Sequence, residues 1–124
     1  MGLLGAAPLG RKTARLKRRW PETWQAGQMC AALEYQNLIG RPQSITFTLL
    51  LGWDREIPST QESIDDFLKE ITPQATENMV RVYTQEMGVS TLPEEAVAAM
   101  GIAFALTMSD LLTTRFITLN AKKR

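Results

Sequence analysis

The chain has 124 residues, of which 44% are hydrophobic, and a formal net charge of +1, which suits one domain with a modest core. It contains no histidine and a single cysteine, Cys30. The lack of histidine removes the commonest general base and metal ligand, and with them serine-triad and zinc-type chemistry. A single cysteine excludes an intrachain disulfide, which fits a reducing compartment such as the cytoplasm.

The charges are separated along the chain. Residues 1–19 carry six basic and no acidic side chains, and residues 122–124 are Lys-Lys-Arg. Residues 20–121 hold five basic and thirteen acidic side chains, a net charge of −8. We therefore predict a basic N-terminal arm over 1–20, a single helical domain over 21–121 and a basic tail over 122–124. Basic ends bind polyanions, lie on an acidic partner or stay solvated.

The N-terminal arm is the candidate site for a polyanion. A run of basic residues can contact phosphates, and a nearby tryptophan can stack on bases. The residues predicted to contact nucleic acid or another anionic partner are Arg11, Lys12, Arg15, Lys17, Arg18, Arg19 and Trp20. The alternative is a solvated tail whose tryptophans pack at the start of the next helix. A third hypothesis is adsorption to an anionic membrane through the arm and the leading Met-Gly-Leu-Leu, but a membrane partner is not our expectation.

The first helix of the domain is predicted over residues 21–39. Pro21 and Glu22 suit a first turn, and Gly40-Arg41-Pro42 ends the helix. Cys30 lies among small and apolar neighbours and is interpreted as a buried thiol, because nothing near it in sequence would lower its pKa. The face predicted to be buried consists of Trp24, Ala31, Tyr35 and Leu38.

Residues 44–53, SITFTLLLGW, allow two interpretations. Apolar residues alternate with Thr, Leu and Gly, which is typical of a strand. The partner predicted for such a strand is Thr113–Leu119, unless another copy of the chain supplies one. The alternative is a short buried helix over 43–51 that Gly52 ends. Two strands alone are marginally stable, which counts against the strand.

Two further helices are predicted over 60–71 and 73–87. Ser59-Thr60-Gln61-Glu62 matches a capping box with Ser59 as the cap, and Thr72-Pro73 is expected to stop the first helix and start the second. Gly88 ends the second helix. Their predicted buried positions are Ile64, Phe67, Leu68 and Ile71, then Met79, Val80, Tyr83 and Met87. Acidic exposed positions argue against a DNA-reading helix-turn-helix, because they would repel phosphate.

The stretch that organises the fold begins at Pro93. From Ala96 to Met108 every residue except Gly101 and Thr107 is apolar, so a helix here is apolar on all sides and must be a core helix or a membrane span. A span needs about 20 apolar residues, and this run breaks at Ser109-Asp110. We therefore predict a central core helix over 93–112 or beyond. The fold expected is a mainly α, single-domain bundle around it, with room for one short two-stranded β element.

No catalytic pattern is present. The sequence contains no glycine-rich phosphate loop and no Gly-x-Ser-x-Gly elbow, and its paired acids lack the further oxygen ligands that a cation site needs. We predict that the chain is not an enzyme, with no catalytic residue, cofactor, metal ion or small-molecule substrate.

The stretch from Leu51 to Ser90 resembles the helical part of tail assembly chaperones of long-tailed bacteriophages. The resemblance rests on Gly52-Trp53-Asp54, Ile64, Phe67-Leu68, Pro73, Ala75, Met79-Val80 and Tyr83. It implies a non-enzymatic helper in the cytoplasm of a bacterial host, which binds tape-measure and tail-tube proteins during assembly and is absent from the finished particle. The basic arm and the long apolar helix after Pro93 depart from that family pattern.

Two functional hypotheses follow. The first is a protein-binding or assembly factor with a protein partner or self-association, since methionine-rich faces adapt to varied surfaces. Its predicted contact residues are Trp53, Met79, Tyr83 and Met87. The second is a nucleic-acid-associated subunit that binds the phosphate backbone through residues 11–20.

Overall fold

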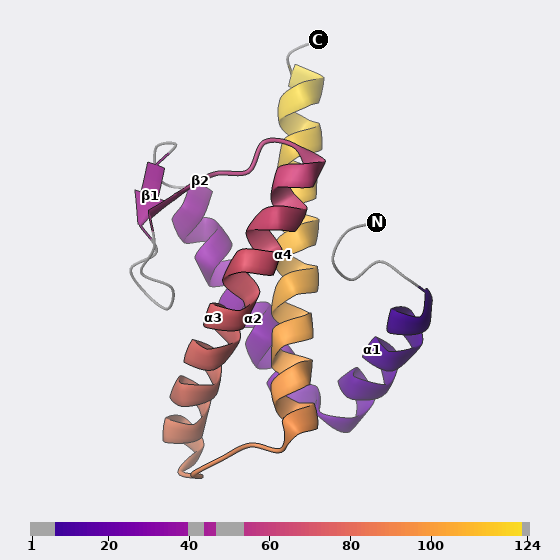
Figure 1. Ribbon diagram of the computed structural model, residues 1–124, viewed down its shortest axis with the longest axis vertical. Coiled ribbons are helices and arrows are strands. Elements are labelled where there is room, and N and C mark those ends of the chain that lie inside the picture. Colours follow the sequence, from indigo (N-terminus) through magenta and orange to yellow (C-terminus); the bar gives the residue numbers. More distant parts are fainter. Residues whose placement is uncertain (1–6, 40–43, 47–53, 123–124) are drawn as a thin grey trace.

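The computed structural model describes residues 7–39, 44–46 and 54–122, with side chains over 13–39 and 57–121. Its elements are the helices α1 (Ala7–Arg19), α2 (Pro21–Ile39), α3 (Gln61–Met87) and α4 (Glu94–Lys122), and the strands β1 (Ser44–Thr46) and β2 (Asp54–Glu56). In Figure 1, α2 and α4 run upward, α3 runs downward, and α1 joins the lower end of α2. This confirms the predicted mainly α helical bundle.

Helix α4 makes the most extensive contacts with the other three helices. It is apolar on more than one side, so it needs cover in more than one direction. Helix α2 covers it most extensively, α3 covers a second side and α1 a third. Its buried side chains are Ala96, Ala99, Met100, Ala103, Phe104, Ala105, Met108 and Leu112.

The core consists of two clusters. The larger lies between α2, α3 and α4, and contains all four positions predicted from the first half of α3 together with Ala31 and Leu38 of α2. The smaller lies between α1, α2 and α4, and consists of Leu16, Trp24, Ala99 and Ala103. The prediction that Met87 is buried is wrong, because 57% of its surface is exposed.

Small residues set the distances between α4 and its neighbours. A Cβ atom added to Gly27 of α2 would lie 2.3 Å from the carbonyl oxygen of Met100 and 2.9 Å from the Cβ of Ala103. A Cβ atom on Gly101 would lie 2.7 Å from Oγ1 of Thr76 in α3. The first obstacle is backbone, which has no rotamer to change, so Gly27 marks a very close approach between α2 and α4.

Helix α3 is one continuous helix, so the predicted break at Thr72-Pro73 is wrong. Pro73 lies inside it and cannot donate a hydrogen bond to the carbonyl of Lys69. Lys69 and Pro73 are both exposed, so the turn that lacks this bond lies on the solvent side of the helix. The buried positions before and after Pro73, from Ile64 to Met79, lie against the same core, and this packing keeps the two halves in one helix.

The caps of α3 differ from the prediction at one end. The N-cap is Thr60, whose Oγ1 accepts a bond from the Ser63 N–H at 3.1 Å, while Ser63 Oγ accepts one from the Thr60 N–H at 2.9 Å. The predicted pair Ser59 and Glu62 is therefore displaced by one residue, because the Ser63 hydroxyl performs the reciprocal role expected of a glutamate. Gly88 ends the helix as predicted, at φ 69°, the left-handed conformation that glycine adopts without strain.

Strand β1 pairs antiparallel with β2, with Ile45 opposite Arg55. The strand partner predicted at 113–119 is wrong, since those residues belong to α4. Their apolar residues continue the helical spacing of the central helix, and Leu112 is buried in the same core. Most of the predicted segment, residues 47–53, lies outside the described residues, and so does Gly52, the cap expected for the alternative helix.

The crossing at Gly27 generates a stability prediction. Replacing a glycine with alanine inside a helix ordinarily raises the free energy of unfolding by up to about 1 kcal/mol. At Gly27 the added methyl would overlap the Met100 carbonyl, so Gly27→Ala should lower the free energy of unfolding by about 2 kcal/mol or more. Urea denaturation measures the change. The exposed neighbour serves as control: Gln28→Ala should leave stability unchanged or slightly higher. An increase for Gly27→Ala would contradict the close approach.

Candidate functional site

A groove of about 390 Å³ lies between α2 and α3. We call it the α2–α3 groove. Its walls are mainly apolar, and all of its lining residues come from one stripe of each helix. From α2 these are Glu22, Gln25, Ala26, Met29, Cys30 and Leu33, and from α3 they are Met79, Val82, Tyr83, Glu86 and Met87.

The groove exists because α2 has a second apolar stripe besides its core face. Ala26, Met29, Cys30 and Leu33 follow at i, i+3, i+4 and i+7, the spacing of one helix face. The first stripe, which contains Ala31 and Leu38, is buried in the core shared by α2, α3 and α4. Helices α2 and α3 each contact α4 more extensively than they contact each other, so the second stripe is left partly uncovered.

The α2–α3 groove is open to solvent along its length. Met29, Leu33 and Met87 are 65%, 52% and 57% exposed. Met79 is buried and Tyr83 half-buried, so they form the floor. Exposed apolar surface that is continuous, instead of scattered singly, indicates an interaction site. Two of its exposed side chains are methionines, whose unbranched chains adapt to different partner surfaces.

One end of the groove is acidic. Helices α2 and α3 run in opposite directions (Figure 1), so Glu22 near the start of α2 and Glu86 near the end of α3 lie at the same end. Both carboxylates are exposed. Among the described side chains, no lysine or arginine lines the groove.

Cys30 lies at the floor of the groove and is buried. Burial, and secondarily the negative charge of Glu34 one turn further along α2, raises the pKa of the Cys30 thiol to about 12. The thiol is therefore protonated at neutral pH and is neither a nucleophile nor a metal ligand there. Within the described residues no cluster of acidic and cysteine side chains could hold a metal ion.

The structure brings three of the four predicted protein-contact residues together. Met79, Tyr83 and Met87 line the α2–α3 groove, and Trp53 lies outside the described residues. The prediction missed the α2 wall, above all Met29 and Leu33. The i, i+3, i+4, i+7 spacing from Ala26 to Leu33 indicates this second apolar face. A helix at the surface of a bundle needs only one core face, and the stripe through Trp24 and Leu38 already accounts for it.

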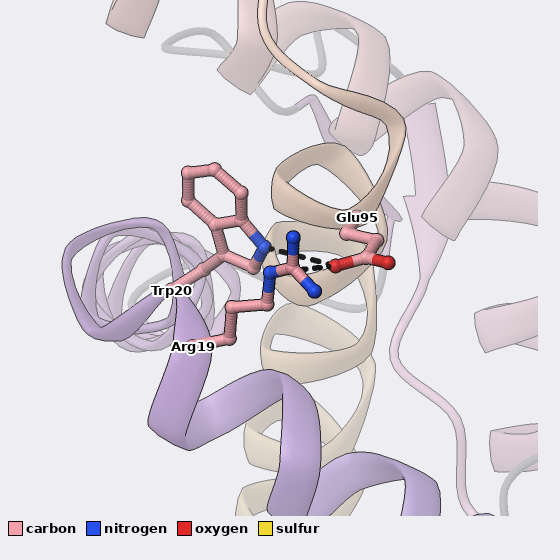
Figure 2. A network of polar contacts seen from close by, with 3 residues as sticks. All are labelled: Arg19, Trp20 and Glu95. Atoms are coloured by element: carbon pink, nitrogen blue, oxygen red, sulfur yellow. Dashed lines mark hydrogen bonds and ion pairs between the residues drawn. The ribbon is translucent and has the colours of Figure 1, made fainter.

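The predicted basic contact residues lie on or next to α1. Arg15, Lys17 and Arg18 are exposed on this helix, and Arg11 and Lys12 belong to it outside the described side chains. Figure 2 shows that the last two of the seven point toward α4: Arg19 Nε lies 3.0 Å from Glu95 Oε2, and the Trp20 indole N–H donates to the same oxygen at 3.4 Å.

Apolar packing holds α1 more strongly than the ion pair does. Arg19 and Glu95 are 63% and 47% exposed, so their pair contributes at most about 1 kcal/mol. Leu16 is only 7% exposed against Ala99 and Ala103, and burying a leucine contributes about 1.5–3 kcal/mol. The apolar side of α1 faces α4, and of its described side chains all the exposed ones except Ala14 are basic.

A second cavity, of about 460 Å³, lies between α3 and the start of α4, and its lining is more polar. Asn78 there is buried. Its Oδ1 accepts bonds from Gln74 Nε2 at 3.4 Å and from Arg81 Nη2 at 3.2 Å. These contacts explain the burial of a polar side chain on this face.

By length and composition α4 is long and apolar enough to cross a membrane, and half of its most apolar stretch is buried inside the bundle. The core helix of a soluble protein meets the same criterion.

The raised pKa of Cys30 generates a reactivity prediction. At pH 8 a thiol of pKa about 12 has roughly a thousandfold less thiolate than one of pKa about 9, and the thiolate is the reacting species. Iodoacetamide should therefore alkylate Cys30 in the folded chain at least a hundredfold more slowly than in urea, as followed by mass spectrometry. Equal rates would show that the floor of the groove is open to water.

No family model matches the chain, no curated protein matches it, and no solved structure matches it.

Proposed function

We propose that the chain is a non-enzymatic protein-binding factor that holds its partner in the α2–α3 groove. The observation that carries this proposal is the continuous apolar surface formed by Met29, Leu33 and Met87 above a buried floor. Three large apolar side chains that are more than half exposed in one groove do not stabilise the monomer. A partner that covers them removes this apolar surface from water, which favours binding.

Within this proposal the more specific role is that of an assembly factor of the tail-chaperone type. Two of the positions that carry the resemblance, Met79 and Tyr83, lie in the groove. A cytoplasmic location fits the buried, protonated thiol of Cys30, which needs no disulfide partner.

The test is capture of partners from the native source with the full chain and two variants. Leu33→Glu places a charge in the groove without touching the core, since Leu33 is 52% exposed. Gln28→Glu adds the same charge on an exposed position of α2 outside the groove. The full chain and Gln28→Glu should retain the partner after chemical crosslinking, and Leu33→Glu should lose at least nine-tenths of it. Equal recovery by all three proteins would contradict a groove-bound partner.

A second candidate function is phosphate-backbone binding through α1. The supporting observation is that Arg15, Lys17 and Arg18 are all exposed on a helix whose other side is docked on α4. The acidic body, net −8 over residues 20–121, would confine such binding to this helix. Groove reading is not part of this proposal, because only backbone contacts are implied.

Fluorescence anisotropy with random-sequence DNA and RNA tests this candidate over a range of salt. Replacing Arg15, Lys17 and Arg18 with glutamine should weaken binding at least tenfold. It should also reduce the magnitude of the slope of log binding constant against log salt concentration by up to about 3, because each phosphate contact contributes about 0.7–0.9 to that slope. Lys69→Gln, on an exposed position of α3, should change neither. Salt-independent binding, or none, would refute the candidate.

A further inference from the structure

The length of the α2–α3 groove matches a short helix. On α2 its lining runs from Glu22 to Leu33, and on α3 from Met79 to Met87. At 1.5 Å per residue these stripes are about 16 Å and 12 Å long, or two to three helical turns. A helix laid along the groove would present apolar side chains at i, i+3 or i+4, and i+7, which is how amphipathic helices bind grooves between helices.

The openness of the groove favours a helix over a small molecule. A drug-sized ligand typically has about 70–90% of its surface buried by its pocket. Here Met29, Leu33 and Met87, on both walls, remain more than half exposed, so a small molecule between them would stay largely in water. A helix covers both walls at once and buries these side chains from above.

The charges of the groove give the partner a polarity. Glu22 and Glu86 lie at one end, while the other end is lined by Leu33 and Met79. No basic side chain among those described in the lining offsets the two carboxylates. A partner with lysine or arginine at the matching end would be attracted to them, and one with acids there would be repelled.

We propose that the α2–α3 groove binds an amphipathic helix of two to three turns that carries lysine or arginine at one end. The apolar face of this helix covers Met29, Leu33 and Met87, and its basic end lies beside Glu22 and Glu86. The inference rests on the proposed protein-binding function and adds the secondary structure and the charge of the bound segment.

The probe is a fluorescein-labelled, helix-forming peptide of about 14 residues with leucine at i, i+3, i+4 and i+7 and three lysines at one end. A second peptide has three glutamates in place of the lysines, and a third keeps the lysines but has glutamine in place of the leucines. By anisotropy with the full chain, the lysine peptide should bind roughly tenfold more tightly than the glutamate peptide. The peptide without leucines should show no saturable binding.

A charge reversal tests the orientation. In Glu22→Lys/Glu86→Lys the preference should invert, so that the glutamate peptide binds more tightly than the lysine peptide. Asp66→Lys/Asp110→Lys makes the same change in net charge at two exposed acids outside the groove, and it should keep the original preference. Glu22→Gln/Glu86→Gln removes the preference without reversing it, and it replaces the reversal if circular dichroism shows that the lysine variant does not fold.

Several outcomes would overturn the inference. Equal affinity for the lysine and glutamate peptides, together with groove-dependent capture of a native partner, would refute the charge polarity and leave the proposed function standing. No peptide binding up to about 1 mM, together with capture unaffected by Leu33→Glu, would refute both. A concentration-dependent dimer abolished by Leu33→Glu in sedimentation would assign the groove to a second copy. Stoichiometric binding of the dye 1-anilinonaphthalene-8-sulfonate without peptide binding would assign it to a small molecule.

Discussion

The structure depends on the need to cover α4 on several sides. The buried side chains of α4 include Ala99, Met100, Phe104 and Ala105, which point in several directions around the helix. Such a helix cannot lie at the surface, and its contacts with the other three helices are the most extensive in the bundle. The small residues of α4 and the glycine at position 27 permit close contact, and close contact gives the dispersion and burial that a modest core needs. This arrangement leaves α2 and α3 less closely packed against each other than against α4, and the α2–α3 groove is the result.

The sequence predicted most of the helical fold because the signals were local and repeated. The run after Pro93, the ends of α2 and the buried stripe from Ile64 to Ile71 each follow from periodicity and terminal residues. The predicted break at Pro73 was wrong because proline on its own disfavours a continuous helix, whereas the packing of the residues before and after it favours one helix. The pairing of β1 with β2 was not foreseen either, because a three-residue strand such as Asp54–Glu56 leaves almost no periodic signal.

Only the α3 side of the candidate site was predicted from the sequence. Met79, Tyr83 and Met87 were named from α3, but the wall formed by Met29 and Leu33 was not, since the sequence of one helix does not say which of two apolar stripes its neighbour leaves uncovered. The groove and α1 also differ in kind. The groove combines apolar walls with one acidic end, and α1 presents basic side chains away from α4. The chain thus has two surfaces of opposite charge.

The position of α4 in the chain has a consequence for synthesis on the ribosome. Helices α1, α2 and α3 are translated before the helix that they pack on, and at about 5–20 residues per second the 29 residues of α4 take a few seconds more. During that interval the stripes that contain Leu38, Ile64 and Ile71 lack the cover that α4 gives them in the folded chain. Until α4 has been made and has docked, the bundle lacks the helix that completes its core, and the apolar surface of this incomplete form is open to aggregation.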